Sequence, residues 1–142
     1  MSGQPAVQVY ERHVSHSDTD ADGVVHFSRY LVYCEDALFS WFRRLGLDLG
    51  LPGAERTVAI TSLQIGYRRP LYFGRRCEVA LAVAGKRRYS LRLDVAIRGD
   101  GEIYADGWLD VAFLYREAWR LAPLPEAFLG EPALALASGV AP

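Results

Sequence analysis

Apolar side chains recur at three- and four-residue steps from about Ser28 to Leu45, which is the longest such pattern in the sequence. This spacing predicts an α-helix with one broad apolar face. Tyr33 and Phe39 fall outside that face, so the helix is apolar on more than one side and is expected to be buried. Ser28 is predicted to cap the helix through its hydroxyl, and Gly46 is a natural stop. The apolar face consists of Tyr30, Leu31, Cys34, Ala37, Leu38, Trp41, Phe42 and Leu45.

Elsewhere the apolar positions alternate with a period of two, which predicts β-strands. One strand precedes the helix and four follow it, with no second long helix between them. The parity of the alternation changes after Ile60, which predicts a bulge or bend in that strand. Gly99-Asp100-Gly101 predicts a hairpin turn between the last two strands. The strands are expected at about residues 7–14, 58–72, 77–84, 89–98 and 103–115.

This order of elements predicts an α+β fold in which an antiparallel five-stranded sheet curls around one long helix. The 142 residues show no repeat and no linker, so we expect a single domain over residues 1–142 with a core from about 7 to 116. After Tyr115 the pattern fades into a segment rich in proline, glycine and alanine. We expect a short docked segment there, followed by a frayed end.

Composition and charge narrow the range of functions. Hydrophobic residues make up 51% of the chain and charged residues 23%, which is typical of a soluble globular protein. The net charge of −1 argues against a nucleic acid or a membrane surface as partner. No apolar run approaches the roughly 20 residues of a membrane span, and the first residues lack the blocks of a signal peptide. Cys34 and Cys77 lack metal-ligand spacing, so we expect free, packed thiols and a cytoplasmic location.

The stretch SDTDADGVVHFSRY, residues 17–30, places three aspartates, a glycine and a histidine just before the predicted helix. A helix N-terminus offers unpaired N–H donors and a positive dipole end. An acyl carbonyl bound there would be polarised, and a nearby aspartate could attack it or activate water. The chain has no G-x-S-x-G elbow and no cysteine in a nucleophile motif. The stretch therefore indicates an acyl-transfer site, such as that of a thioesterase, that needs no metal or cofactor.

Each residue of this stretch also has a structural interpretation. Aspartate favours turns, so Asp20 by itself could be a turn residue, and Asp18 is interpreted as the acceptor that stabilises the turn. Asp22 next to Gly23 suits turn chemistry, and Gly23 permits a positive φ or a close backbone approach. Glu35 lies opposite the apolar face of the helix and suits a solvated or subunit-facing position as well as a catalytic one.

Basic residues cluster at two places. Lys86-Arg87-Arg88 is either a solvated hairpin turn or a site for the phosphates of a nucleotide. Arg68 and Arg69 either serve phosphates in the same way or form ion pairs.

The order of elements and the stretch from Asp18 to Phe27 resemble the hotdog-fold acyl-CoA thioesterases of the 4-hydroxybenzoyl-CoA thioesterase family, which includes the Tol-Pal-associated branch. The family pattern reads D-x-D-x-x-G-x-V-aromatic, with a tyrosine at the helix start that corresponds to Tyr30. The resemblance covers about residues 7–116. Further matches are Glu35 within C-E-D-A, the segment Tyr67-Arg68-Arg69-Pro70-Leu71, and Gly74.

This resemblance implies roles for particular residues. Asp20 would be the catalytic carboxylate, Gly23 would belong to the same turn, and the backbone N–H of Phe27 would polarise the thioester carbonyl. His26 departs from the family, whose members often have an aromatic residue there, and this leaves the shape of the substrate pocket open. The substrate-binding residues would be His26, Ser28, Tyr30, Arg87, Arg88 and Ser90, with the last three at the CoA phosphates.

The resemblance also implies a homodimer or homotetramer with active sites at subunit interfaces. It leaves open whether Asp20 attacks the carbonyl or deprotonates water, and whether the carrier is CoA or an acyl carrier protein. Tyr33, Phe39 and Trp41 could line a pocket for an aryl or medium-chain acyl group, or belong to the core. Two other functions stay open. One is a hotdog dehydratase that uses His26, and the other is a non-catalytic module that binds acyl-CoA or acyl carrier protein.

Overall fold

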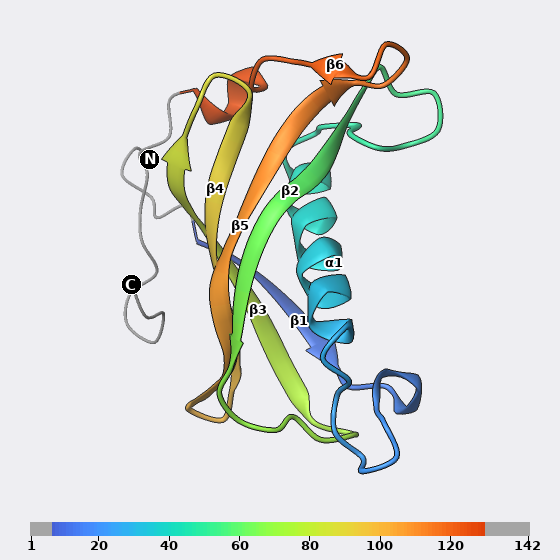
Figure 1. Ribbon diagram of the computed structural model, residues 1–142, viewed down its shortest axis with the longest axis vertical. Helices are drawn as coiled ribbons and strands as arrows, with labels where there is room; N and C mark the ends of the chain where they lie inside the picture. Colours follow the sequence, from blue (N-terminus) through green and yellow to red (C-terminus); the bar gives the residue numbers. More distant parts are fainter. Residues whose placement is uncertain (1–6, 130–142) are drawn as a thin grey trace.

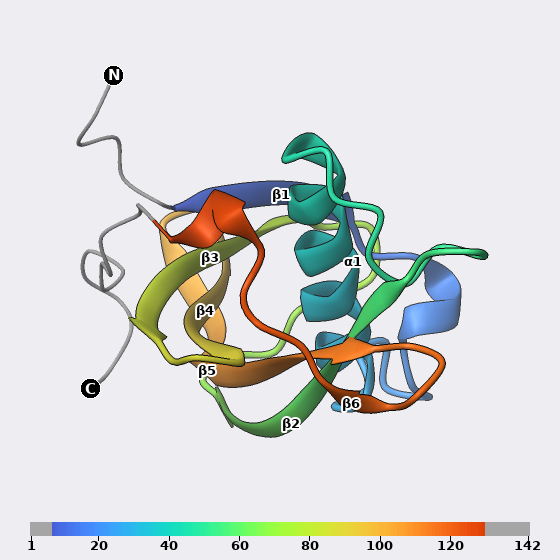
Figure 2. The same ribbon diagram turned by 90° about the horizontal axis from the view of Figure 1, so that it is seen from above.

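A long helix lies along the inner face of a strongly curved antiparallel sheet, which wraps around it (Figures 1 and 2). The computed structural model describes residues 7–129. Two short 3-10 turns are also present: η1 (His16–Asp18) lies between the first strand and the helix, and η2 (Glu126–Phe128) follows the last strand. The main elements are β1 (Gln8–His13), α1 (Arg29–Arg44), β2 (Arg56–Tyr67), β3 (Arg76–Lys86), β4 (Ser90–Gly99), β5 (Glu102–Tyr115) and β6 (Arg120–Leu121).

The strands are ordered β1-β3-β4-β5-β2, and each of these pairs is antiparallel. This arrangement confirms the predicted α+β class with a sheet curled around one helix. The sheet has six strands rather than the expected five, because the chain turns back after β5 and adds β6 beside it. Leu121 pairs with Leu114, and the Ala122 N–H donates to the carbonyl of Phe113, so this short strand is held by the end of β5.

Two local predictions within the sheet are confirmed. The register of β2 on β5 shifts between Ile60 and Ser62, which is the predicted irregularity. The hairpin between β4 and β5 turns at Asp100 and Gly101, whose φ angles are 52° and 75°. Two consecutive positive φ angles match the right-handed twist of the strands that they connect.

β2 ends at Tyr67, earlier than the expected end near Tyr72. The N–H groups of Arg68 and Arg69 both donate to the carbonyl of Tyr104, at 2.8 and 3.2 Å. Two donors on one acceptor break the regular ladder, so the chain leaves the sheet at this point and crosses the end of the molecule.

The core between α1 and the sheet contains a cluster of four aromatic rings. Phe42 packs against Phe113 and Phe128, with ring centroids 6.0 and 5.9 Å apart, and Trp41 lies 5.4 Å from Phe128. Phe128 is almost fully buried. The expected docked segment after residue 115 is therefore part of the core, whereas the expected frayed end, residues 130–142, lies outside the described residues.

Candidate active site

The loop between β1 and α1 folds against the connection between β2 and β3 at one end of the sheet (Figure 1). The Val25 N–H donates to the carbonyl of Leu71 at 2.8 Å, and the Phe73 N–H donates to the carbonyl of Gly23 at 3.1 Å. Inside the loop, the Gly23 N–H donates to the carbonyl of Asp20 at 3.0 Å. The aspartate-rich turn is therefore held both by itself and by the neighbouring connection.

Gly23 has a φ of +80°, which confirms the expectation of a positive φ. A Cβ atom at this position would have no neighbour within 4 Å. Backbone conformation rather than lack of space therefore selects glycine here, because residues with a side chain are strained in this region of φ.

Asp20 is exposed at the tip of this turn. Its Oδ1 accepts the Asp22 N–H at 2.9 Å, a hydrogen bond typical of an aspartate turn. Within residues 7–129, no other group donates to the Asp20 carboxylate. Its second oxygen is therefore open to solvent or to a substrate.

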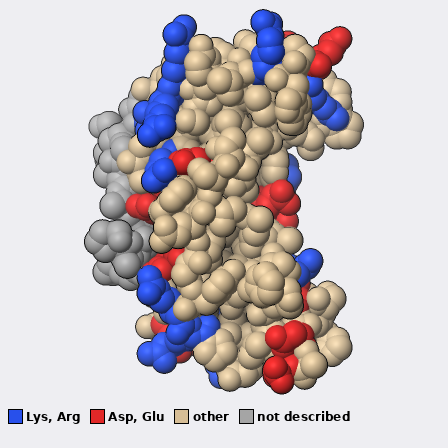
Figure 3. Space-filling model, viewed as in Figure 1, with Lys and Arg blue, Asp and Glu red and all other residues tan. Residues whose placement is uncertain are grey.

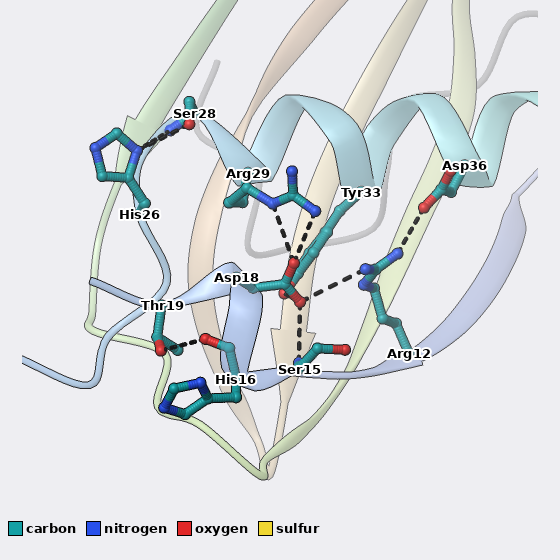
Figure 4. Close-up of polar contacts among 10 residues, drawn as sticks. All are labelled: Arg12, Ser15, His16, Asp18, Thr19, His26, Ser28, Arg29, Tyr33 and Asp36. Atoms are coloured by element: carbon teal, nitrogen blue, oxygen red, sulfur yellow. Dashed lines mark hydrogen bonds and ion pairs between the residues drawn. The ribbon is translucent and has the colours of Figure 1, made fainter. Parts of the chain in front are cut away.

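Asp18 has the opposite environment, since it is 1% exposed and its carboxylate is surrounded by donors (Figure 4). Oδ2 accepts hydrogen bonds from the Tyr33 hydroxyl at 2.7 Å and the Ser15 N–H at 2.9 Å. Oδ1 lies 3.0 Å from Nε and from Nη2 of Arg29, and Nη2 of Arg12 lies 3.5 Å from Oδ2. Asp18 is thus the turn-stabilising acceptor that the sequence predicted, held by charge as well as by hydrogen bonds.

These contacts set the ionisation of both partners. Burial by itself raises the pKa of Asp18, but the hydrogen bonds from Tyr33, Ser15 and Arg29 and the charge of Arg12 outweigh it, so this pKa lies below its ordinary value. Burial, together with the hydrogen bond to the carboxylate, raises the pKa of Tyr33. At neutral pH the pair is therefore an ionised carboxylate and a protonated phenol.

Sequence reasoning did not find the residues that surround Asp18. Arg12 belongs to β1 and Tyr33 to the second turn of α1, and only the fold brings them to the carboxylate. The sequence contains one indication of this contact. Tyr33 lies off the main apolar face of the predicted buried helix, and a buried tyrosine hydroxyl needs a hydrogen-bond partner.

Three consecutive residues just before α1 differ in the hydrogen bonds that their backbone N–H groups make. The His26 N–H donates to the carbonyl of Asp18 at 2.9 Å, and the Ser28 N–H donates to Nδ1 of His26 at 3.2 Å. Between them, the Phe27 N–H makes no hydrogen bond within the described residues. This is the donor that the family resemblance assigns to the thioester carbonyl.

The predicted hydroxyl cap of the helix is wrong. Ser28 does occupy the N-cap position, but its backbone is already helical, with φ −68° and ψ −22°, and its hydroxyl makes no capping bond. The hydroxyl lies 2.8 Å from Nδ1 of His26 instead. At the other end, Gly46 has a φ of +76° directly after the helix, as its predicted stop requires.

A groove of about 300 Å³ opens beside this helix start. The rings of Tyr30 and Tyr67 lie 5.2 Å apart, and the Tyr67 hydroxyl donates to the carbonyl of Phe27 at 3.3 Å. Burial raises the pKa of Tyr30 to about 12, so its hydroxyl stays protonated and able to donate at neutral pH. The groove is lined by Val24, Val25, Phe27, Tyr30, Tyr67, Arg68, Arg69 and Pro70.

The structure therefore brings part of the predicted site together. Phe27 and Tyr30 line the groove, while His26 and Ser28 are exposed beside it. The other aromatic candidates on the helix belong to the core, since Tyr33 and Trp41 are buried and Phe39 packs against the core cluster.

Arg87, Arg88 and Ser90 lie at the opposite end of the sheet from the aspartate-rich turn (Figure 1). The Arg87 N–H donates to the carbonyl of Ser90 at 2.9 Å and closes the turn between β3 and β4. Both arginines are exposed, and the Arg88 guanidinium stands 5.3 Å from the ring of Tyr89. One chain by itself therefore does not place these residues beside Asp20.

Two other arginines lie at the groove itself. Nε and Nη2 of Arg68 lie 2.9 and 2.8 Å from Oδ1 of the buried Asp106, which confirms the ion-pair interpretation for this residue. Nε of Arg69 lies 3.6 Å from Oε1 of Glu102, and the Arg69 side chain is mostly exposed. Figure 3 shows lysine and arginine side chains gathered towards both ends of the visible face, with acidic side chains between and among them.

The comparison with known proteins decides the family. A model of the thioesterase-like superfamily matches residues 14–131, which is most of the chain. The chain belongs to this superfamily. A 1,4-dihydroxy-2-naphthoyl-CoA hydrolase from Microcystis aeruginosa is 31% identical over 120 residues, which cover 83% of this chain and 87% of the relative. The hydrolase of the same name from Synechococcus elongatus is 29% identical over 120 residues, covering 82% and 88%.

A solved structure agrees with this family. The crystal structure of a 1,4-dihydroxy-2-naphthoyl-CoA thioesterase from Synechocystis superposes with a TM-score of 0.76 and 24% identity, covering 89% of this chain and 99% of that one. The likeness confirms the hotdog fold that the sequence resemblance implied. As a member of the thioesterase-like superfamily, the protein is a thioester hydrolase.

Both cysteines of this thioester hydrolase are free and buried. Burial raises the pKa of the Cys34 thiol to about 12. Burial is also the main reason that the pKa of Cys77 is raised to about 11. Neither thiol therefore ionises at neutral pH. Residues 7–129 contain no cluster of three potential metal-ligating side chains and no helix long and apolar enough to cross a membrane.

Proposed function

We propose that the protein hydrolyses an acyl-CoA thioester to a free acid and CoA, with Asp20 as the catalytic carboxylate and the Phe27 N–H as the donor to the thioester carbonyl. One observation carries this proposal. An open carboxylate stands on a turn whose backbone is hydrogen-bonded to His26, and the next residue has an N–H without an acceptor among the described residues.

The chemistry follows from these two groups. When a carbonyl oxygen accepts the Phe27 N–H, the negative charge that develops on it during attack is stabilised, and one such donor is typically worth about 3–4 kcal/mol. The CoA thiolate is a good leaving group, so the site needs no strong acid. Gly23 keeps the turn that carries Asp20 in its observed conformation.

Asp20 can act in two ways. As a nucleophile it attacks the thioester carbon, expels the thiolate and forms a mixed anhydride, which water then hydrolyses. As a general base it removes a proton from water, which attacks directly. A single turnover in H₂¹⁸O tests for the anhydride. An unlabelled first product, with ¹⁸O in the Asp20 carboxylate, requires an anhydride that water attacks at the Asp20 carbonyl, because the general-base route labels the product in the first turnover.

For the acyl group, we propose a hydroxylated aromatic acid. The two relatives described above are named as hydrolases of 1,4-dihydroxy-2-naphthoyl-CoA. The groove of this chain is lined by the rings of Phe27, Tyr30 and Tyr67, which suit an aryl group. The assignment to the 4-hydroxybenzoyl-CoA thioesterase family and its Tol-Pal-associated branch is a finer proposal that rests on the D-x-D-x-x-G turn.

We also propose a homodimer or homotetramer that completes the site. β2 is an edge strand of the sheet, and Leu63 and Tyr67 on it are 41% and 54% exposed. An exposed apolar edge of this kind favours pairing with a second copy. A second copy would also supply Arg87 and Arg88 to a groove that lies far from them in the same chain. Sedimentation at micromolar concentration tests this, and a monomer would contradict it.

The proposed activity is tested by a hydrolysis panel in which release of free thiol is measured. The panel contains short, medium, long and aromatic acyl groups, including 4-hydroxybenzoyl and 1,4-dihydroxy-2-naphthoyl, on CoA and on acyl carrier protein. We expect the highest kcat/KM for a hydroxyaryl-CoA. Binding without release of thiol from any substrate would favour the non-catalytic binding module, and loss of water from a 3-hydroxyacyl thioester would favour the dehydratase. The cytoplasmic location stays a prediction from the sequence.

A further inference from the structure

The buried carboxylate of Asp18 joins three parts of the chain that meet beside the proposed site (Figure 4). Its Oδ1 holds Arg29 in the first turn of α1, and its Oδ2 holds the Tyr33 hydroxyl one turn later. The same Oδ2 lies 3.5 Å from Arg12 of β1. Both carboxylate oxygens are therefore used, and the side chain ties the loop to the strand before it and to the helix after it.

The backbone of Asp18 makes a second connection. Its carbonyl accepts the His26 N–H at 2.9 Å, directly before the Phe27 N–H, and the following residue, Thr19, pairs with Val25 in an isolated β-bridge. Asp20 follows next in the chain. Asp18 is thus anchored to the helix by its side chain, and its backbone aligns the two sides of the aspartate-rich turn.

We infer that Asp18 is a positioning residue for thioester hydrolysis. It holds the turn that carries Asp20 against the start of α1, next to the Phe27 N–H that is proposed to bind the thioester carbonyl. Asp18 does not act on the substrate itself. Its side chain is 1% exposed and each of its oxygens already accepts from protein donors, so it has no open position for a thioester or for attacking water.

The inference rests on the proposed function, because Asp20 and Phe27 are the groups that it positions. A displacement of about 1 Å between reacting groups can cost about 10²-fold in rate. A loosened anchor should therefore lower kcat while leaving KM nearly unchanged, since the groove itself keeps its lining. A merely stabilising residue would lower the melting temperature and leave kcat intact well below it.

The test compares two changes in the anchor with a matched control. Asp18→Asn removes the charge, and Tyr33→Phe removes only the hydroxyl that donates at 2.7 Å. The control is Asp110→Asn on the outer face of the sheet, where the carboxylate also holds an arginine, Arg92, and accepts a hydroxyl, that of Ser62. All three variants are assayed with the best acyl-CoA of the panel at a temperature at which each is folded.

We expect Asp18→Asn to lose about 10- to 100-fold in kcat and Tyr33→Phe about 3- to 10-fold, and Asp110→Asn to stay within about twofold of the wild type. A second readout is independent of activity. In a ¹⁵N-labelled sample, hydrogen exchange of the His26 amide should speed up in both anchor variants more than that of a core amide such as Val95, and should not do so in Asp110→Asn.

Two results would overturn the inference. One is a wild-type kcat in folded Tyr33→Phe and Asp18→Asn despite a lower melting temperature. The other is His26 exchange that changes only in step with the core amide. If Asp18→Asn does not fold, Tyr33→Phe decides by itself. If the wild type releases no thiol from any substrate, the proposed function fails, whereas the exchange of the His26 amide still tests whether Asp18 holds the turn.

Discussion

Two aspartates of one turn, with a single residue between them, have opposite environments in this protein. Asp20 is exposed and accepts one backbone N–H, whereas Asp18 is buried and holds two arginines and a tyrosine hydroxyl. A carboxylate that must attack or activate water needs an open oxygen, and one that must hold a loop needs its oxygens occupied. At the scale of residues, exposure and hydrogen bonding support the proposed assignment of catalysis to Asp20 and of positioning to Asp18.

The substitution Asp20→Asn tests this division directly. It keeps the size of the side chain and an oxygen that can accept the Asp22 N–H, but removes the carboxylate that we propose as nucleophile or base. We expect the variant to fold, assemble and bind substrate, and kcat to fall at least about 10²-fold. Steady-state kinetics with acyl-CoA and a thermal melt give both quantities.

The neighbouring substitution Asp22→Asn is the matched control, since it removes another exposed charge of the same turn and should leave kcat nearly unchanged. Near wild-type hydrolysis by Asp20→Asn, together with an inactive His26→Ala, would mean that the catalytic group lies elsewhere in the turn.

Acid should remove the stability that Asp18 contributes. Its pKa in the folded protein lies below the ordinary value of about 3.9, so its ionised form is stabilised by folding. This contribution is complete above the unfolded pKa and is lost as the pH falls through the folded pKa. We expect Asp18→Asn to lower the free energy of unfolding by about 2 kcal/mol at pH 7, and this deficit to shrink steadily below about pH 4. Urea titrations of both proteins across this range measure it, and a deficit independent of pH would contradict the assignment.

At the scale of elements, a glycine allows the backbones of β2 and β5 to approach each other closely. Gly107 of β5 faces the part of β2 that follows its register shift. A Cβ atom on Gly107 would overlap the carbonyl oxygen of Gln64 and lie 2.7 Å from its carbonyl carbon. The edge strand can therefore lie this close to β5 only because residue 107 has no side chain.

Gly107→Ala should force β2 away from β5 and lower the free energy of unfolding by at least about 2 kcal/mol. The comparison is Gly85→Ala in β3, where the new Cβ would meet only the Cβ of Arg92, at an ordinary 3.6 Å. That change should be neutral or stabilise by about 0.5 kcal/mol. Chemical denaturation of the two variants gives the contrast, and equal effects would show that β2 adapts to the added methyl group.

At the scale of the whole molecule, the two halves of the proposed substrate site lie at opposite ends of the sheet. The turn with Asp20 and the groove occupy one end, and Arg87, Arg88 and Ser90 occupy the other (Figure 1). A CoA molecule bound between the two would therefore have to span two subunits. The proposed assembly and the proposed phosphate site thus depend on each other.

Replacing both Arg87 and Arg88 by alanine should raise KM for acyl-CoA and leave kcat for a short, phosphate-free thioester nearly unchanged, because contacts to the phosphates bind substrate and transition state alike. A mixed dimer then locates the arginines. When one subunit contains Asp20→Asn and the other contains the double arginine change, a site shared between subunits regains one intact copy. We expect wild-type KM and about half of the wild-type kcat per dimer.

Separate tags on the two subunits allow the mixed dimer to be purified for this assay. A mixed dimer that keeps the raised KM would place the arginines in the same subunit as the Asp20 that they serve. Equal loss on the phosphate-free thioester would instead give the arginines a structural role.

The sequence by itself determined the helix, the order of the longer strands, the bulge after Ile60 and the hairpin at Asp100, because each of these depends on periodicity or turn chemistry within a short window. It also located the aspartate-rich turn and the helix start that follows it, since both lie within a few residues of each other along the chain. All of these features depend on interactions between residues that are close together in the sequence.

Only the tertiary structure decided what surrounds each of those residues. Nothing local shows that Arg12 and Tyr33 reach Asp18, that Phe128 enters the core, or that the turn between β3 and β4 lies at the far end of the sheet from the loop between β1 and α1. These relations join residues far apart in the chain, and they depend on how the sheet curves around the helix and on which side chains then compete for the same space. The hydroxyl cap predicted at Ser28 is absent although its competitor is local: Nδ1 of His26, two residues earlier, accepts the Ser28 N–H and lies 2.8 Å from the Ser28 hydroxyl, while the His26 N–H is held by the carbonyl of Asp18 across the turn.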